Sequence, residues 1–169
     1  MLTRKACPEC AVKIAACSPP YCNDALVALS YEGLARDVML GFKYRNQRAV
    51  AALFAELLLA RLRTVQEIDH LDVVTWVPTT RERRMARGHD QAETLARIIG
   101  RSLGLPVRKL LDRKTIGHQT GHSRAQRLIG VAFRGRSMSA PVTVLVVDDV
   151  VTTGATMRMA KQALTSAGA

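Results

Sequence analysis

One stretch of the chain decides the fold, namely Val144-Leu145-Val146-Val147-Asp148-Asp149-Val150-Val151-Thr152-Thr153-Gly154-Ala155-Thr156. Its first four residues predict a buried strand, the small residues after the two acids predict a loop, and the chain from Thr156 onwards has a helical apolar spacing. In open α/β sheets, ligands bind outside the carboxyl ends of the strands. The stretch therefore predicts a ligand site to which a strand delivers two carboxylates and a loop leads into a helix.

The residue types in this stretch suit a phosphate and a sugar. Amides and hydroxyl groups of its three threonines can surround a phosphate at the positive end of the helix dipole, and Gly154 lets the backbone approach closely. Asp148 and Asp149 stand one sugar length away, where they can accept hydrogen bonds from vicinal ribose hydroxyls or hold the outer shell of a metal ion. A strand–turn–helix whose Asp and Thr only cap the helix is the plainer alternative.

Strands alternate with helices along the rest of the chain. Leu71–Val77 is rich in β-branched and aromatic residues and ends at Pro78, which predicts a strand, and a short strand is predicted at 107–111. Apolar spacing predicts helices at 33–44, 50–62, 90–103 and 156–167, closed in the last two cases by Gly104 and Gly168, and residues 112–123 predict a loop. The alternation predicts an α/β fold with a parallel sheet, in which 142–147 is a central strand covered on both faces.

Length and composition agree with one globular domain. At 169 residues, with 48% hydrophobic and 23% charged residues, the chain can bury a core, and its uncharged stretches are too short to cross a bilayer. The first ten residues hold two cysteines and no apolar signal region. We therefore expect a cytoplasmic protein without a secretion signal and without membrane insertion.

Positive charge is concentrated in one window. The formal net charge is +11, and between Arg81 and Arg136 twelve Arg and two Lys face four acids, a net of +10. Positive charge concentrated in one segment predicts a negatively charged partner, either a polyphosphate or a nucleic acid. The whole chain has 19 Arg and only 6 Lys, and this preference for Arg favours anion recognition. A solvated basic surface that only keeps the protein soluble is the alternative.

The four cysteines all lie near the N-terminus, as Cys7-x2-Cys10 and Cys17-x4-Cys22. Two pairs this close, beside a basic domain without an export signal, suit one tetrahedral Zn²⁺ better than disulfides. We therefore predict a zinc-binding stub at residues 1–25 and a separate domain at residues 26–169. The zinc is expected to be structural, because four thiolates leave no open coordination position. Unligated thiols and a redox pair are the alternatives.

The stretch Val144–Thr156 resembles the phosphoribosyl-pyrophosphate motif of type I phosphoribosyltransferases, in which apolar residues, two acids and Thr-Thr-Gly-x-Thr follow one another. The rest of the chain is similar to the ComF branch, which is named for a protein linked to DNA uptake in competent bacteria. Four features carry this similarity: the cysteine-bearing N-terminus, Tyr31-Glu32-Gly33 with Phe42-Lys43-Tyr44, Val77-Pro78 with Arg87-Gly88-His89-Asp90-Gln91-Ala92, and Arg113-Lys114-Thr115 with Gln119-Thr120, Arg127 and Ala132-Phe133. The resemblance implies a type I phosphoribosyltransferase fold that binds Mg²⁺ with phosphoribosyl pyrophosphate or a nucleoside monophosphate.

The resemblance also implies roles for single residues. The turn Val77-Pro78-Thr79-Thr80 stands where the family has its pyrophosphate loop, and the arginines after it could take pyrophosphate oxygens or form only a solvated basic surface; they are Arg81, Arg84 and Arg87. Residues 113–123 match the loop that closes over the substrate, so Arg113 and Lys114 would meet the leaving pyrophosphate and Gln119 would face the reacting centre. In the motif itself, the catalytic carboxylates Asp148 and Asp149 would precede the phosphate-binding residues Val151, Thr152, Thr153, Gly154, Ala155 and Thr156.

The chain departs from the family pattern at three places. Family members usually have Arg-Gly-Phe-Asn-Gln where this chain has His89 and Asp90, so His89 is either a core filler or a ligand, while Asp90 keeps an N-cap. An Asn that the family has near Arg127 is missing. The sequence stops at Ala169 where the family continues into another strand, so we expect a sheet that lacks one strand and exposes an edge. A truncated or shortened protein would account for this, and so would pairing with a partner chain, for instance in a homodimer.

Three functions fit these expectations. The first is a magnesium-dependent phosphoribosyltransferase, a pentosyl-transferring glycosyltransferase that passes ribose 5-phosphate to a nucleobase or another nitrogen compound. The second is a non-catalytic module that handles nucleic acid in DNA uptake. In this case the basic window would bind single-stranded DNA through salt-sensitive contacts. The third is a regulator that senses phosphoribosyl pyrophosphate. In the second, the pyrophosphate site would serve as a sensor or as a relic that grips phosphates. The chemistry of the site is the same in all three.

Overall fold

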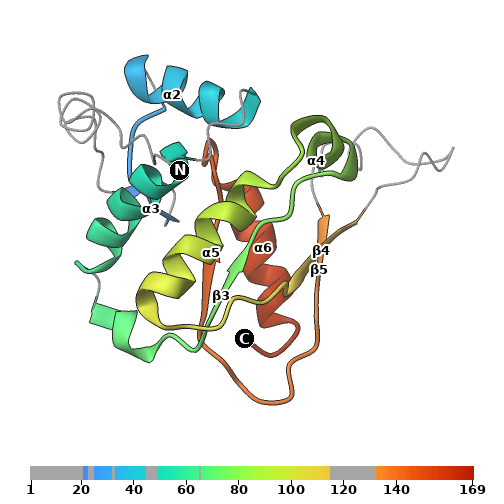
Figure 1. The fold of residues 1–169 in the computed structure, drawn as a ribbon. Coiled ribbons are helices and arrows are strands. Elements are labelled where there is room, and N and C mark those ends of the chain that lie inside the picture. Colours follow the sequence, from blue (N-terminus) through green and yellow to red (C-terminus); the bar gives the residue numbers. More distant parts are fainter. Residues whose placement is uncertain (1–20, 23–24, 32, 45–48, 65, 115–131) are drawn as a thin grey trace, which may run out of the picture.

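The computed structural model describes residues 21–22, 25–31, 33–44, 49–64, 66–114 and 132–169, and Figure 1 shows them as a mixed α/β fold. The helices are α2 (Gly33–Tyr44), α3 (Ala49–Leu62), the 3-10 helix η1 (Gln66–His70), α4 (Arg81–Arg87), α5 (Gln91–Leu103) and α6 (Ala155–Thr165). The strands are β1 (Tyr21–Cys22), β2 (Ala25–Leu26), β3 (Val73–Trp76), β4 (Leu111–Lys114), β5 (Ala132–Gly135) and β6 (Val144–Val147). The α/β class predicted from the sequence is confirmed.

A small parallel sheet lies at the centre of the fold. β3 and β6 pair in parallel, with Val73 opposite Val144 and Trp76 opposite Val147. A parallel bridge from Val74 to Val107 adds one more segment on the other side of β3. Within the described residues β6 therefore has a single neighbour and is an edge strand, so its predicted central position is wrong. Of the short strand predicted at 107–111, only this bridge at Val107 is present, and β4 begins at its last residue, Leu111.

Each face of the parallel pair is covered by helices, which confirms the predicted burial on both sides. Because side chains alternate along a strand, Val74 and Trp76 pack into one core with α3 and α5, while Val73 packs into a second core with α6. Figure 1 shows α5 on one face of β3 and β6 and α6 on the other. The apolar run at both strands thus results from burial on two faces.

Helix α5 is positioned by the caps that its sequence predicts. Asp90 Oδ1 accepts a hydrogen bond from the Glu93 N–H at 3.3 Å, and Gly104 closes the helix in the left-handed conformation at φ 70°. The predicted apolar stripe of α5 is buried, including Leu95 and Ile99. In α6 the C-cap is Ser166 rather than the predicted Gly168, because the helix ends at Thr165, two residues earlier than predicted.

Strands β4 and β5 form an antiparallel pair, with Leu111 opposite Gly135. The prediction of a loop at 112–114 is wrong, and β5 was missed. The pairing joins residues about twenty positions apart, so neither strand carries a local signal beyond the buried Leu111 and Phe133. At Gly135 the absence of a side chain lets β5 approach the Ala163 carbonyl oxygen of α6, which a Cβ atom would contact.

An exposed ion-pair cluster joins β4 to the chain after β5. Asp112 accepts hydrogen bonds from Arg136 Nε at 3.0 Å and Nη2 at 3.2 Å, and its Oδ1 lies 2.7 Å from Lys109 Nζ. Arg136 first, and then Lys109, lower the pKa of Asp112 from 3.8 to about 2. A carboxylate whose folded pKa is lowered contributes stability above its unfolded pKa and loses it as the pH falls towards the folded value.

We therefore expect the protein to lose stability as the pH falls from about 4 to about 2, and the Asp112→Asn variant to lose less over that range. Urea unfolding at each pH measures this. The Asp112 side chain is 40% exposed, so solvent screens the cluster and the variant should lose less than about 1 kcal/mol at neutral pH. Equal slopes for the two proteins would contradict the assignment.

Candidate functional site at the carboxyl ends of β3 and β6

The two parallel strands end at the same edge of the sheet. The Val77 N–H donates to the Val147 carbonyl oxygen at 2.9 Å, which continues the ladder to the last residue before each loop. The turn that follows β3 and the acidic loop that follows β6 therefore leave the sheet side by side. Asp148 and Asp149 are half-buried there, and the Asp149 N–H donates to Asp148 Oδ1 at 2.8 Å.

The loop after β6 delivers small residues to the start of α6. Gly154 is buried and adopts the left-handed conformation at φ 71°, which a residue with a side chain would strain. Arg158 supports the loop by donating to the Thr153 carbonyl oxygen at 3.1 Å. Gly154 gives the helix no side-chain cap, and the Ala155 N–H donates to Thr153 Oγ1 at 3.4 Å. The other first-turn amides of α6 have no partner within the helix, as at any helix N-terminus.

The turn after β3 leads directly into the basic helix α4. Thr80 caps this helix, with its hydroxyl oxygen accepting from the Arg83 N–H at 3.3 Å, and no residue of α4 is buried. Two of the three predicted arginines contact residues of α5. Arg84 Nη2 lies 3.6 Å from Glu93 Oε2, and Arg87 Nη1 donates to Gln91 Oε1 at 3.1 Å. Arg81 is exposed at the first position of α4.

Arg113 connects β4 to the same turn. Its Nη1 donates to the Pro78 carbonyl oxygen at 3.3 Å, and its guanidinium lies 5.8 Å from the centre of the Phe133 ring. Burial lowers the pKa of Arg113, and the positive charge of Arg83 lowers it further, while Asp148 acts in the opposite direction. Arg113, at the turn after β3, is thus influenced both by the positive charge of Arg83 and by the negative charge of Asp148 in the acidic loop. Arg83 lies exposed on α4 and was not among the predicted site residues, because nothing in the sequence distinguishes it from the other arginines of this helix.

Asp90 connects the turn after β3 to the start of α5. It is 5% exposed, its Oδ2 accepts from the Thr79 N–H at 3.0 Å, and its Oδ1 caps α5. Burial raises the pKa of Asp90, and the negative charges of Glu93 and Asp149 add to the rise. The N-cap at Asp90 was predicted, but the second hydrogen bond to Thr79 was not. Since that amide donates to Asp90, the turn can offer a ligand only the remaining groups of Thr79 and Thr80.

His89 is part of a hydrogen-bonded ring between α4 and α5. Gln91 Oε1 accepts from Arg87, so Gln91 Nε2 faces His89 Nε2 at 3.4 Å and is the donor. His89 Nδ1 then carries the proton and donates to the Arg87 carbonyl oxygen at 2.9 Å. Of the two roles considered for His89, these contacts favour a structural one.

The remaining predicted site residues are less completely described. Lys114 is exposed at the end of β4. Gln119 and three of the cysteines, Cys7, Cys10 and Cys17, lie outside the described residues, and of Cys22 only the backbone in β1 is described. Among the described residues, no three His, Cys, Asp or Glu side chains gather closely enough to hold a metal ion.

The zinc site remains a prediction, and it has a direct test. If the four cysteines bind one Zn²⁺, metal analysis of protein purified without a chelator should give one zinc per chain. Chelation should unfold residues 1–25, since binding and folding of such a stub are coupled. Protein without zinc would contradict the assignment.

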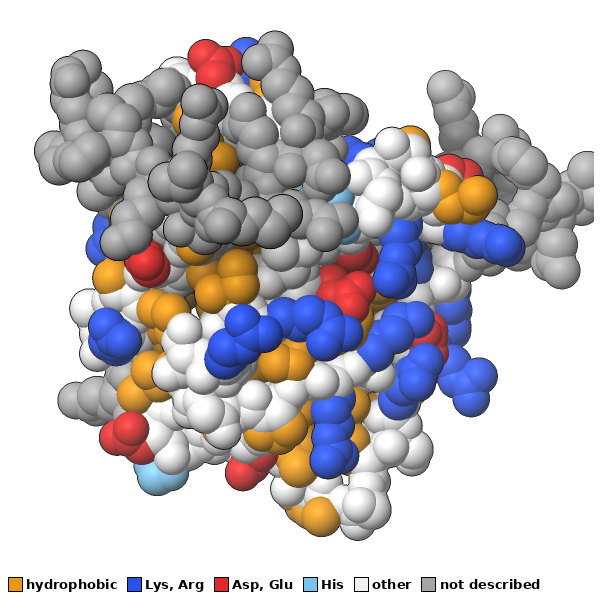
Figure 2. Space-filling view, in the orientation of Figure 1, with side chains coloured by type: hydrophobic (Ala, Val, Ile, Leu, Met, Phe, Trp, Pro, Cys, Tyr) orange, Lys and Arg blue, Asp and Glu red, His pale blue; other side chains and the backbone are white. Residues whose placement is uncertain are grey.

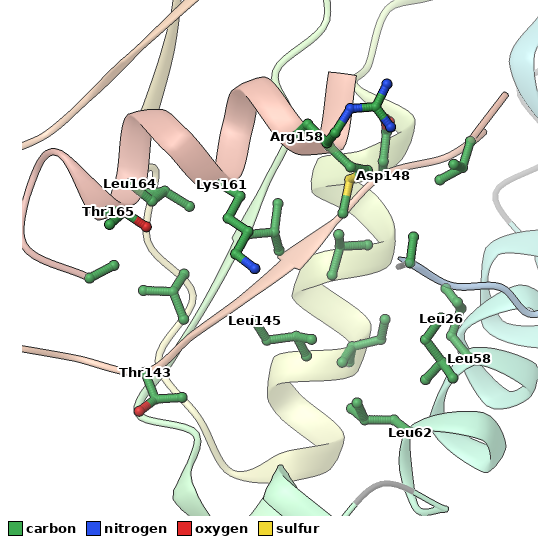
Figure 3. A pocket seen from close by; sticks show the side chains of 18 of the residues that line it. Leu26, Leu58, Leu62, Thr143, Leu145, Asp148, Arg158, Lys161, Leu164 and Thr165 are labelled. Atoms are coloured by element: carbon green, nitrogen blue, oxygen red, sulfur yellow. The ribbon is translucent and has the colours of Figure 1, made fainter. Parts of the chain in front are cut away.

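A groove of about 740 Å³ runs along the open edge of β6. Figure 3 shows Leu58 and Leu62 of α3 on one side and Lys161 of α6 on the other, with Asp148 and Arg158 near one end. An exposed sheet edge was expected from the sequence. Among the described residues this edge is β6, which forms one wall of the groove.

The basic window covers a broad surface. Figure 2 shows Lys and Arg side chains spread over α4, α5 and the β4–β5 pair. Two acids pair with four of these cations: Glu93 with Arg84 and Arg97, and Asp112 with Lys109 and Arg136. Within the basic window, the exposed arginines that form no ion pair with another described residue are Arg81, Arg83, Arg101, Arg108 and Arg134. No described helix has the length and apolar character that a membrane-spanning segment needs.

These features define an α/β protein with two carboxylates, a small-residue loop and a turn contacted by Arg113 at one edge of a parallel sheet. The chain is similar to the competence protein ComFC of Bacillus subtilis (strain 168), with 26% identity over 141 residues, which are 82% of this chain and 57% of that protein. It is also similar to the competence protein ComFC of Streptococcus pneumoniae (strain ATCC BAA-255 / R6), with 26% identity over 143 residues, 83% of this chain and 61% of that protein. These distant homologues support an assignment to the ComF family.

The chain spans about three fifths of the length of the curated relatives it matches. No family model matches the sequence, and no solved structure matches it.

Proposed function

We propose that this chain is a ComF-type protein of the phosphoribosyltransferase class that binds phosphoribosyl pyrophosphate with Mg²⁺ at the edge formed by the ends of β3 and β6. The observation that carries the proposal is the hydrogen bond between Val77 and Val147. It aligns the two strand ends, so that the acidic loop and the turn Pro78–Thr80 leave the sheet side by side.

The parts of this edge match the parts of the ligand. Asp148 and Asp149 suit the vicinal hydroxyls of a ribose, and the start of α6 at Gly154 suits its 5-phosphate. The pyrophosphate would lie beside the turn Pro78–Thr80, within reach of the guanidinium N–H groups of Arg113 other than the one that donates to Pro78.

The same edge fits Mg²⁺ as well. Mg²⁺ is commonly bound through one or two carboxylates together with substrate phosphates, and Asp148 and Asp149 supply that number of carboxylates. When bound, the ion would neutralise charge on the pyrophosphate. Asp148 and Asp149 would orient the sugar, and Arg113 would stabilise charge that develops on the leaving group.

A ligand series measured by thermal unfolding tests the binding. Phosphoribosyl pyrophosphate with Mg²⁺ should raise the Tm most, ribose 5-phosphate and pyrophosphate should each raise it less, and omission of Mg²⁺ should reduce the effect. At 100 times its Kd a ligand adds about 2.7 kcal/mol to the free energy of unfolding. Transfer is tested by pyrophosphate release that depends on an added nitrogenous base. An unchanged Tm with phosphoribosyl pyrophosphate would reject the proposal.

A competence-related role in nucleic-acid handling is the second candidate, and the exposed arginines that form no ion pair with another described residue favour it. Such binding would be mainly electrostatic, and its affinity for single-stranded DNA would fall steeply with salt. The names of the two relatives agree with this role but do not specify it.

A further inference from the structure

Phe133 of β5 lies directly opposite Arg113 of β4 in the antiparallel strand pair. Residues that are directly opposite each other in such a pair direct their side chains to the same face of the sheet. The guanidinium of Arg113 accordingly lies over the ring of Phe133, with 5.8 Å between its Cζ atom and the centre of the ring. Phe133 is 6% exposed and belongs to the apolar core beside α6, so its neighbours fix the position of the ring.

The β4–β5 pair is itself attached to β3. The Leu110 N–H, just before β4, donates to the hydroxyl oxygen of Thr75 at 3.2 Å, and Thr75 is fully buried within β3. The Leu110 carbonyl oxygen accepts from the Arg136 N–H at 2.8 Å, which connects the residue after β5 to the same point. The ring of Phe133 therefore has a defined position relative to the strand that leads into the turn Pro78–Thr80.

The contacts of Arg113 with Pro78 and with Phe133 use different parts of its guanidinium. Nη1 donates to the Pro78 carbonyl oxygen at 3.3 Å, whereas the ring faces the Cζ atom and engages no N–H group. The remaining N–H groups can donate to the oxygen atoms of an anion. Because a side chain that is already ordered loses less rotamer freedom when a ligand binds, the contact with the ring favours anion binding at this place.

We propose that Phe133 is a positioning residue for the leaving group, which holds the guanidinium of Arg113 so that its remaining N–H groups face the pyrophosphate beside the turn Pro78–Thr80. The inference rests on the proposed function and adds to it a residue that does not itself touch the ligand. The ribose and its 5-phosphate are assigned to the acidic loop and to the start of α6, away from Phe133. Loss of the ring should therefore weaken the binding of pyrophosphate and leave that of ribose 5-phosphate unchanged.

The variant Phe133→Leu tests this selectivity, with Leu164→Val as its control. Leu164 is 2% exposed near the end of α6 and belongs to the same core, so the control also removes volume from this core but leaves the ring in place. Calorimetry in the presence of Mg²⁺ measures the affinities of the full chain for pyrophosphate and for ribose 5-phosphate, and urea unfolding measures stability. We expect Phe133→Leu to bind pyrophosphate about 10-fold more weakly than the wild type. Leu164→Val should keep both affinities.

Two further variants show whether the ring acts through Arg113. Phe133→Met fills more of the space than Leu but also lacks a π face, so it should lose the same affinity for pyrophosphate as Phe133→Leu even where its stability differs. In the Arg113→Ala background, Phe133→Leu should have no additional effect on that affinity, because the two residues act as one unit.

The outcomes separate this inference from the proposed function. Unchanged pyrophosphate affinity in Phe133→Leu, an equal loss for ribose 5-phosphate, an equal loss in Leu164→Val, or additive effects of Phe133→Leu and Arg113→Ala would overturn the inference and leave the proposed function standing. If the wild type binds neither pyrophosphate nor phosphoribosyl pyrophosphate, the proposed function fails, and the inference fails with it.

Discussion

The variant Asp148→Asn/Asp149→Asn should lose about 100- to 10,000-fold in affinity for phosphoribosyl pyrophosphate and remain folded. Each carboxylate is expected to hold a ribose hydroxyl through a charged hydrogen bond worth about 1.5–3 kcal/mol, and the two losses add. Stability should change little, since both residues are half-buried and an Asn at 148 keeps an oxygen for the Asp149 amide. Calorimetry measures the affinity and urea unfolding measures the stability.

The matched control is Asp37→Asn/Asp69→Asn, which changes the net charge equally at two exposed positions, on α2 and on η1. It should bind like the wild type. If the Asp148/Asp149 variant also retains full affinity, the ribose does not lie at the acidic loop.

The second large effect is expected at Asp90. Replacement by Ala removes the cap of α5 and leaves the Thr79 amide without its acceptor, which together should cost about 2–4 kcal/mol of stability. Asp90→Ser is more informative, because one hydroxyl can accept from the Glu93 N–H but cannot also reach Thr79. We expect Asp90→Ser to recover the part of the stability that the cap contributes. We also expect it to bind phosphoribosyl pyrophosphate at least about 10-fold more weakly than the wild type, because Asp90 no longer fixes the turn Pro78–Thr80.

Urea unfolding and calorimetry on the same preparations separate the two roles of Asp90. Wild-type affinity in Asp90→Ser would mean that the carboxylate is only a helix cap. Equal losses of stability in the Ala and Ser variants would mean instead that the cap itself was assigned wrongly.

The parts of the fold that the sequence predicted are those with a strong local pattern. β6 and the helix after it are marked by an uninterrupted apolar run followed by two acids and small residues. α5 is marked by its apolar stripe and by Asp90 and Gly104 at its two ends, and all three features are present. Such elements are specified by residues that lie close together in the chain.

The features that the sequence did not predict depend on distant residues. β4 pairs with β5 across about twenty positions, so Asp112–Lys114 resembled a polar loop. β6 was expected to be central because helices on both faces make a strand apolar whether or not it has two neighbours. The second oxygen of Asp90 has a role that appears only when the turn after β3 is in place.

Calorimetric titration of phosphoribosyl pyrophosphate with Mg²⁺, followed by a separate titration of single-stranded DNA, tests the central claim most directly. We predict saturable binding of one phosphoribosyl pyrophosphate per chain that requires Mg²⁺ and is lost in Asp148→Asn/Asp149→Asn. Absence of that binding, together with DNA binding that weakens steeply with salt, would contradict the claim and identify the basic surface as the functional one.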